Sequence, residues 1–234
     1  MAPKVSYVIP VYNEEAILHA AVVDLREQLS SFDLAYEIVL AENGSRDATA
    51  AIAEKLSRKY PEVSTLSVPE PNYGAALRAG IECARGDNVI CEEIDLCDVD
   101  FHLRALAILD SGEADMVIGS KLLAGSSDNR PMTRHAASLL YNGILRALLG
   151  FEGTDTHGLK AFRREAMLPV VRACVVDKDV FASELVIRAY RSGVRVREIP
   201  VRVMEKRTPT INLVRRVPNV IKNLAKLTRA IRTR

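Results

Sequence analysis

Tryptophan is absent from this chain, and aromatic residues amount to only 5% of it. Proteins that bind single-stranded nucleic acids stack the bases on aromatic side chains, so this scarcity argues against a nucleic-acid partner. No apolar run approaches the roughly 20 residues of a membrane-spanning helix, and the first residues lack the basic-then-apolar pattern of a signal peptide. We therefore expect a cytoplasmic protein, or one bound peripherally to the cytoplasmic face of a membrane.

Cysteine is scarce as well, with four residues at positions that do not match zinc-ligand spacing. They are Cys83, Cys91, Cys97 and Cys174. Two of them lie in or beside one apolar run, which favours reduced, buried thiols over disulfides. Cys97 is the exception, because it follows a pair of acidic residues.

What the chain does contain is enough apolar material for one large core, since 48% of its 234 residues are hydrophobic. Short apolar runs alternate with segments of helical periodicity, which predicts an α/β fold with a mainly parallel central sheet flanked by helices. One domain is expected over residues 1–205. We expect strands at residues 4–9, 37–41, 64–68, 88–91, 116–119 and 194–203, and helices at 14–30, 47–58, 74–84, 101–111, 134–149 and 181–191.

The segment 206–234 differs from the rest in charge, because it holds nine Lys or Arg and no Asp or Glu. Its apolar residues keep helical spacing, which predicts a basic amphipathic helix that Pro218 divides in two. Two roles stay open. The helix can pack its apolar stripe on the domain, and it can lie on an anionic membrane, where each basic residue contributes about 1 kcal/mol; the two roles are compatible.

Two acidic turns each follow an apolar run of the predicted sheet. Residues 42–47 (E-N-G-S-R-D) follow the second strand, and residues 92–95 (E-E-I-D) follow the fourth. In open α/β sheets the carboxyl ends of the strands form the ligand crevice, and two carboxylates one residue apart can hold a divalent cation. The turns therefore predict a metal-bound ligand that bears phosphate.

Eight sequence blocks, in order and across nearly the whole chain, resemble the family 2 glycosyltransferases of GT-A fold. Within that family they are most similar to the dolichyl-phosphate mannose synthase-like, or polyprenyl-phosphate glycosyltransferase, branch. The blocks are I-P-V-Y-N-E-E, E-N-G-S-R-D-A-T, A-R-G-D, E-I-D, V-I-G-S-K, D-T-H-G-L-K-A-F-R-R-E, F-A-S-E-L and V-R-E-I-P-V. The resemblance implies a Rossmann-like GT-A fold and metal-dependent, inverting transfer of a hexose, mannose or glucose, from GDP- or UDP-hexose.

By the same resemblance the metal ligands are Glu93, Asp95 and Cys97, in place of the family's D-x-D and a third oxygen ligand. The cation would be Mn²⁺ or Mg²⁺, and the sulfur of Cys97 leaves the choice, and even the need for metal, open. A solvated strand end is the simpler alternative for the two carboxylates. The resemblance implies the following nucleotide-sugar contacts: Pro10, Tyr12, Glu14, Glu42, Asn43, Ser45, Arg78, Glu93, Ile94 and Asp95.

Several of these residues have local explanations too. Ser45 suits a turn, Asp47 suits the cap of the following helix, and we favour those roles for both. Arg78 is as well explained by an exposed helix position. Lys121, Arg134 and Ser138, with Lys206 and Arg207, are the implied ligands of an acceptor phosphate; surface charge is the alternative.

Asp155 and His157 are, with Asp95, the candidate catalytic residues. A phosphate acceptor is already anionic and needs no base, so Asp155 would then orient other groups. A hydroxyl acceptor would make Asp155 the leading general base and His157 the second choice. We favour a polyprenyl phosphate, because the basic segment 206–234 suits a membrane surface.

Two other functions stay open. One is transfer to a soluble or glycan hydroxyl. The other is a nucleotide-sugar-binding scaffold without activity, suggested by the departures from the family pattern at Glu42, Asn43, Glu93, Cys97 and Lys121.

Overall fold

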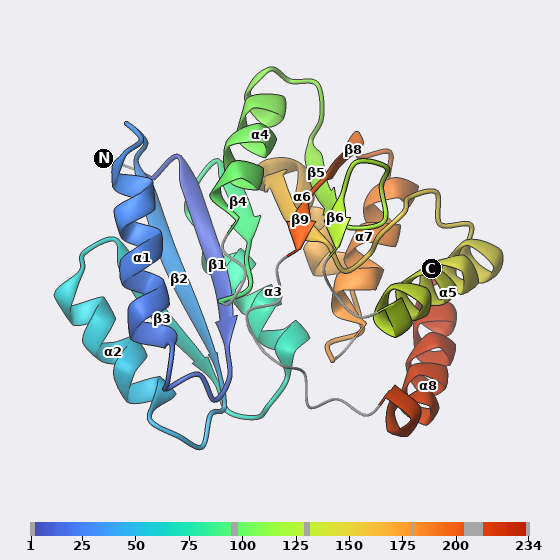
Figure 1. The fold of residues 1–234 in the computed structure, drawn as a ribbon, viewed down its shortest axis with the longest axis horizontal. Coiled ribbons are helices and arrows are strands. Elements are labelled where there is room, and N and C mark those ends of the chain that lie inside the picture. Colours follow the sequence, from blue (N-terminus) through green and yellow to red (C-terminus); the bar gives the residue numbers. More distant parts are fainter. Residues whose placement is uncertain (1–2, 95–97, 129–131, 179, 204–212, 233–234) are drawn as a thin grey trace.

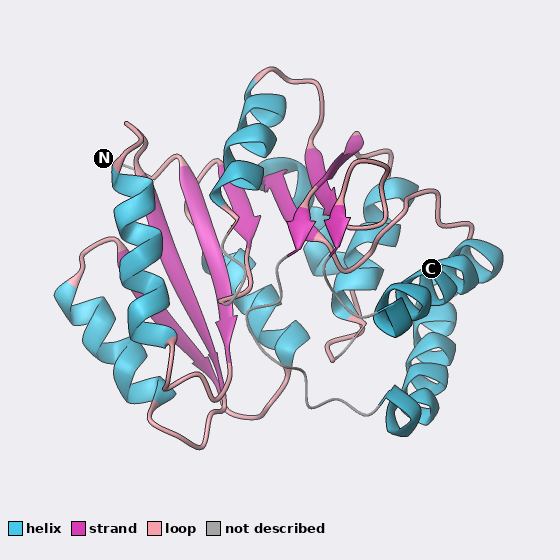
Figure 2. Cartoon of the chain, in the orientation of Figure 1, coloured by secondary structure: helices cyan, strands magenta, loops and turns pink. Residues whose placement is uncertain are grey.

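A seven-stranded sheet forms the centre of the molecule, with helices on both faces (Figures 1 and 2). The computed structural model describes residues 3–94, 98–128, 132–178, 180–203 and 213–232. The strand order is β3-β2-β1-β4-β7-β5-β8, and every neighbouring pair is parallel except the two that involve β7. The strands are β1 (Val5–Val11), β2 (Tyr36–Asn43), β3 (Val63–Val68), β4 (Asn88–Cys91), β5 (Met116–Ser120), β7 (Leu159–Arg163) and β8 (Val196–Pro200).

Two separate cores cover the faces of this sheet. The helices α1 (Leu18–Ser30), α2 (Thr49–Lys59) and α4 (Val99–Asp110) supply one core. The other core is built by α3 (Tyr73–Cys83), α5 (Met132–Leu149), α6 (Arg164–Ala173), α7 (Phe181–Arg191) and α8 (Leu213–Arg232). Successive residues of a strand point to opposite faces, so β1, in which every residue is buried, is covered on both sides.

The predicted α/β fold and mainly parallel sheet are confirmed, but four details differ from expectation. The strands β6 (Ser127–Asp128) and β7 and the helix α6 were not predicted. Residues 194–203 form two strands rather than one, because β8 joins the main sheet and β9 (Arg202–Val203) pairs with β6.

The helix α8 packs onto the domain. Leu224, Leu227 and Ile231 are buried in the core shared with α5 and α7. Arg188 and Arg191 of α7 donate hydrogen bonds to the carbonyl groups of Ala230 and Ile231, at 3.0 and 3.2 Å. The packed alternative for this segment is therefore confirmed.

The expectation that Pro218 divides the helix was wrong, since α8 is continuous from Leu213 to Arg232. A proline early in a helix removes one backbone hydrogen bond, which the packing of the later turns outweighs.

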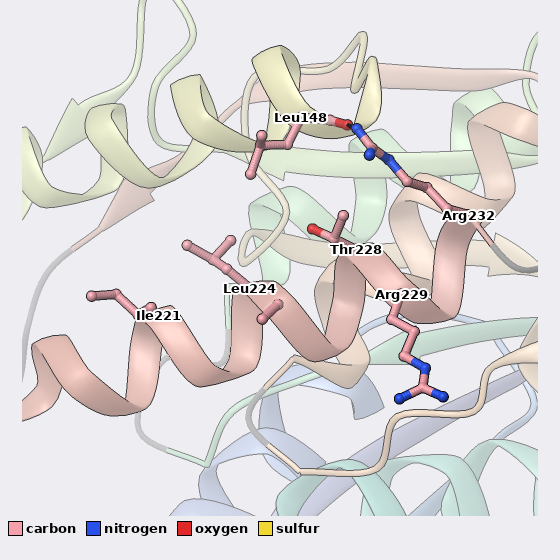
Figure 3. A pocket seen from close by; sticks show the side chains of 7 residues that line it. Leu148, Ile221, Leu224, Thr228, Arg229 and Arg232 are labelled. Carbon is pink, nitrogen blue, oxygen red and sulfur yellow. Dashed lines mark hydrogen bonds between the residues drawn. The ribbon is translucent and has the colours of Figure 1, made fainter.

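A shallow groove of about 530 Å³ lies between α5 and α8 (Figure 3). Its walls are mostly apolar, with Leu148 on α5 facing Ile221 and Leu224 on α8 and with Arg229 and Arg232 at one end. Within the described residues, none of the helices combines the length and the apolarity needed to cross a bilayer.

The cysteines that the structure describes are free thiols. Burial raises the pKa of Cys91 and of Cys174 to about 12, so both stay protonated and unreactive at neutral pH. Cys83 is exposed, unlike the buried thiol that its apolar surroundings in the sequence suggested.

Candidate active site

Five connections meet at the edge of the sheet where the parallel strands end. They follow β1, β2, β4 and β5, and the fifth precedes β7, whose reversed direction brings its first residue to the same edge. This is the edge at which open α/β sheets bind ligands.

The connections after β1 and β2 are hydrogen-bonded to each other. Ser45 accepts a bond from the backbone N–H of Asn13 at 3.0 Å, and the side chain of Asn13 accepts from the N–H of Arg46 at 2.9 Å. Asn13 itself has a φ of 53°, in the left-handed region that asparagine tolerates. Asp47 accepts bonds from the N–H groups of Thr49 and Glu15. Ser45 thus shapes the turn, as the local interpretation predicted. Asp47 also ties the loops together, but the predicted cap is not formed as such, since Ala48 is the N-cap of α2 and makes no side-chain cap bond.

The first acidic turn points into the protein. Glu42 is buried, and its carboxylate accepts hydrogen bonds at 2.5 Å from the hydroxyl of Ser67 and the N–H of Ser45. Burial alone would raise the pKa of Glu42, but these hydrogen bonds hold it below its ordinary value. Asn43 is buried too and accepts a bond from the N–H of Asn72. In this structure both side chains fix the loops at this edge of the sheet, and contact with a base stays a prediction.

The remaining predicted nucleotide contacts of the first connection lie close by. Pro10 is buried at the end of β1, Tyr12 is exposed beyond it, and Glu14 donates its N–H to the hydroxyl of Thr49 at 2.7 Å. Arg78 turns elsewhere. Its guanidinium donates to the carbonyl of Cys174 at 2.8 Å and pairs with Asp177 at 3.1 Å, which ties α3 to the connection between α6 and α7. A diphosphate contact of Arg78 therefore remains a prediction without support from its position.

The second acidic turn alternates buried and exposed side chains. Glu92 is buried and hydrogen-bonded to His102 of α4, whose ring also lies 5.0 Å from that of Tyr7. Glu93 is exposed at the edge of the sheet, and Ile94 is buried below it. The pair of Glu92 with His102 thus anchors the turn from beneath and leaves Glu93 at the surface.

Two predicted metal ligands, Asp95 and Cys97, lie outside the described residues. Among the described residues, no three His, Cys, Asp or Glu side chains converge as a metal site would require. An exposed carboxylate at Glu93 with a second at Asp95 in the sequence is the hard oxygen donor set that Mn²⁺ and Mg²⁺ prefer. The chemistry of the turn therefore fits a divalent cation.

Asp155 is fully buried on the connection that precedes β7. One carboxylate oxygen accepts the N–H of His157 at 2.9 Å, and the other lies 3.3 Å from the ammonium of Lys121. Burial tends to raise the pKa of Asp155, but Lys121, the N–H of His157 and nearby Lys160 hold it below its usual range. Asp155 is thus a paired carboxylate rather than a proton acceptor open to a ligand.

A chain of hydroxyl and amide groups attaches the Asp155 connection to α5 and α7. Thr156 bonds Ser183 at 3.0 Å, and Ser183 in turn bonds Tyr141 at 3.1 Å. The side-chain oxygen of Asn142 accepts the N–H of Thr156 at 3.3 Å, and its amide group donates to the carbonyl of Ser138 at 2.9 Å. This network links the predicted acceptor residue Ser138 to the catalytic candidate Asp155.

The exposed side of the same connection carries His157. Its ring lies edge-on to that of Tyr141, 5.3 Å between centroids. Arg134 lies one turn before Ser138 on α5, partly exposed. The remaining acceptor candidates, Lys206 and Arg207, lie outside the described residues. The structure thus brings Lys121, Asp155 and His157 together.

The sequence did not single out two residues that the structure places at this edge. Lys160 is buried beside Asp155, and Tyr73 of α3 directs its hydroxyl towards Glu93 and Cys91. Burial of that hydroxyl, followed by the charge of Glu93, raises the pKa of Tyr73, although 39% of the residue is exposed. Lys160 had a sequence signal, since it is the one charged residue in the run L-K-A-F.

Gly158 is required where β7 crosses close to β5. A Cβ at Gly158 would lie 2.1 Å from the carbonyl oxygen of Gly119, an approach that backbone cannot relieve. We expect Gly158→Ala to destabilise the protein by at least about 1–3 kcal/mol, as overpacking does, and to lower Tm by about 5 °C in a thermal melt. Gly143→Ala in α5 is the matched control, because its Cβ meets no atom within 4 Å and it should leave Tm unchanged or raise it. Equal melting curves for Gly158→Ala and the wild type would contradict this account.

Comparison with known proteins identifies the family of this chain. The sequence model described as glycosyl transferase family 2 matches residues 6–168. The chain is 35% identical over 218 residues to the glycosyltransferase AglD of Haloferax volcanii, which covers 91% of this chain and 35% of that protein. It is 30% identical over 212 residues to a dolichyl-phosphate beta-glucosyltransferase of Trichomonas vaginalis, covering 84% of this chain and 64% of that protein. The chain thus spans between about a third and two thirds of these relatives.

The fold is similar to that of solved glycosyltransferases. Glucosyl-3-phosphoglycerate synthase from Mycobacterium tuberculosis, solved with Mn²⁺ and UDP-glucose, superposes with a TM-score of 0.67 at 21% identity, over 98% of this chain and 79% of that one. This likeness supports the predicted GT-A fold. The match over residues 6–168, together with the ordered strand-end turns, shows that the chain belongs to glycosyl transferase family 2.

Proposed function

We propose that this chain catalyses inverting transfer of a hexose, mannose or glucose, from a nucleoside-diphosphate sugar to a polyprenyl phosphate. We choose a phosphate acceptor because Asp155 is paired with Lys121. A hydroxyl acceptor needs a base to remove its proton, and a buried carboxylate whose pKa is lowered by a lysine is poorly suited to that task. A phosphate acceptor is already anionic, so it requires a cation rather than a base.

In the proposed reaction, Lys121 and Arg134 bind the acceptor phosphate, with Ser138 as a hydrogen-bond donor. Asp155 holds the Lys121 ammonium in place, and the network through Asn142 fixes α5 relative to it. A phosphate oxygen attacks the anomeric carbon from the side opposite the leaving diphosphate, so an α-linked donor gives a β-linked product.

The donor half is formed by the first, second and fourth strand ends. Glu93 and Asp95, with Cys97 beside them, would hold Mn²⁺ or Mg²⁺, which when bound neutralises the charge that builds on the leaving diphosphate. Pro10, Tyr12 and Glu14 border the nucleotide, and Glu42 and Asn43 keep their loops in shape.

The names of two similar proteins favour particular substrates. One is a dolichyl-phosphate beta-glucosyltransferase, and the other was solved with Mn²⁺ and UDP-glucose. They make UDP-glucose the first donor to test and Mn²⁺ the first metal.

Contact with the membrane would come through α8 and the neighbouring face of α5. Neither helix contains an acidic residue, and together they expose Met132, Leu139, Leu140, Leu148 and Ile221. An apolar surface on two helices whose charged residues are all basic is complementary to an anionic bilayer. The protein would then act peripherally at the cytoplasmic face, where a polyprenyl phosphate is presented.

Calorimetric titration with GDP, UDP and dTDP tests the donor half, each nucleotide with Mn²⁺, with Mg²⁺ and with chelator. We expect one nucleotide to bind tightly in a metal-dependent way, and Asp95→Ala to lose the metal dependence. That nucleotide sugar is then offered with a short polyprenyl phosphate or with hydroxyl acceptors. Transfer only to hydroxyl acceptors would refute the lipid-phosphate acceptor. Nucleotide binding without transfer to any acceptor would indicate a scaffold, and binding of no nucleotide would refute the donor half of the proposal.

A further inference from the structure

A lysine lies in the middle of the sheet, beneath the candidate active site. Lys160 is the second residue of β7, and its neighbours across the two adjacent strands are Cys91 of β4 and Ile118 of β5. Only 5% of Lys160 is exposed. The strand residues around it on this face, Cys91, Ile118 and Phe162, belong to the apolar core, so a charge at this position costs several kcal/mol unless something offsets it.

Charged groups surround the Lys160 ammonium on the side of the site. It donates a hydrogen bond to the carbonyl of Gly158 at 2.6 Å. Asp155 and Glu93 are the two carboxylates close enough to favour its charged form, and Lys121 is the like charge that opposes it. Burial lowers the pKa of Lys160, and the charges of Asp155 and Glu93 act in the opposite direction, whereas Cys91 is a protonated, neutral thiol at neutral pH.

The charges around Lys160 indicate which carboxylate its ammonium group neutralises. Asp155 is already paired with Lys121 at 3.3 Å. Lys121 and Lys160 together carry two positive charges against one on Asp155. The strand register pairs Lys160 with Cys91, two residues before Glu93, so the remaining positive charge lies at the base of the acidic turn. The mechanism proposed above makes no use of this charge.

We infer that Lys160 is a cation supplied by the protein to the donor half of the site, sharing with the divalent metal the neutralisation of the acidic turn and of the leaving diphosphate. It acts through its charge from beneath the turn and is therefore a positioning residue. This inference rests on the proposed function, and specifically on metal binding at Glu93 and Asp95.

A fixed cation at this position has two consequences of opposite sign. It repels a divalent metal ion, so it weakens metal binding to the turn. It attracts a diphosphate, so it strengthens nucleotide binding when no metal is present. Loss of packing alone would weaken both.

The test compares Lys160→Met with the wild type, because methionine keeps the length and shape of the side chain without the charge. We expect Mn²⁺ alone to bind about three- to tenfold more tightly to the variant, and UDP or GDP with chelator to bind about three- to tenfold more weakly. Lys160→Arg, which keeps the charge, should bind Mn²⁺ as the wild type does. Thermal melts of both variants establish that they are folded.

Two controls test whether the effects on affinity come from the charge of Lys160 and depend on its neighbour Glu93. Lys4→Met removes one positive charge at the opposite end of the sheet, where Lys4 pairs with Asp110, and should leave both affinities unchanged. In a Glu93→Gln background the gain in Mn²⁺ affinity from Lys160→Met should shrink, because its partner carboxylate is gone. Mn²⁺ affinity that is unchanged or lower in a folded Lys160→Met protein would overturn the inference alone. A wild type that binds no Mn²⁺ would refute the proposed metal site and the inference with it.

Discussion

Asp155→Ala is expected to destabilise the protein by about 3–5 kcal/mol at pH 7, because removing one partner of a buried ion pair leaves the other charge uncompensated. Two cations depend on this carboxylate. Lys121 lies 3.3 Å from it and is itself largely buried, and Lys160 is enclosed in the apolar core beneath it. Urea denaturation of the wild type and the variant measures the difference in the free energy of unfolding.

The effect should depend on pH in a defined direction. Although burial raises the pKa of Asp155, Lys121 and the N–H of His157 lower it further, so the folded pKa lies below the unfolded value of about 3.9. A group with a depressed folded pKa contributes stability above its unfolded pKa, and that stability is lost as the pH falls through the folded pKa. The difference in the free energy of unfolding between the wild type and Asp155→Ala should therefore be constant near neutrality and become smaller below about pH 4.

Asp110→Ala is the matched control. Asp110 also pairs with a lysine, Lys4, at 3.1 Å, but both side chains are about half exposed. Exposed pairs contribute about 0–1 kcal/mol, so this variant should unfold almost as the wild type does. If both variants lost the same free energy of unfolding, Asp155 would stabilise the fold no more than a surface carboxylate does.

Reversing the charge of Lys222 and Lys226 on α8 is expected to weaken binding to anionic vesicles by at least about 30-fold, since each basic residue at a membrane surface contributes about 1 kcal/mol. Both lysines are exposed and lie one helical turn apart, so Lys222→Glu with Lys226→Glu should not disturb the packed side of α8. Co-sedimentation with vesicles that contain anionic lipid measures the partition.

Substitution is a sharper test than deletion of residues 206–234, because deletion would also remove Leu227 and Ile231 from the core. The control is Lys55→Glu with Lys59→Glu on α2, an exposed pair with the same spacing at the far side of the molecule (Figure 1). This control variant should bind vesicles and nucleotide as tightly as the wild type does. Equal vesicle binding by the two double variants would contradict a membrane role for α8.

The meeting of the two acidic turns at one edge of the sheet could be anticipated from the sequence because its signals are local. An apolar run followed by an acidic turn specifies a strand end, and parallel strands bring such ends together. The direction in which Glu42 points was not predictable in this way. It depends on the hydroxyl of Ser67, which β3 supplies from 25 residues further along the chain.

The elements that were missed depend on long-range contacts. The strand β7 is only five residues long and pairs in the antiparallel sense with β4 and β5, so no local period identifies it. The helix α6 contains Pro169, which lowers its intrinsic helical propensity. It forms because Met167 and Val171 are buried in the core. The role of Lys160 likewise became visible only when β7 placed it beside Cys91 and Asp155.

Because β7 runs antiparallel to β5, the segment between them starts and ends at the same edge of the sheet. β5 ends at Ser120 and β7 starts at Leu159, and Gly119 and Leu159 are neighbours across the two strands. Residues 121–158 therefore leave the sheet and return to it at adjacent positions, carrying α5 and Asp155 with them. Such a segment can be lengthened or exchanged during evolution while the strands keep their register. Under the proposed function, the acceptor residues on this segment can thus change without altering the strand ends proposed to bind the nucleotide.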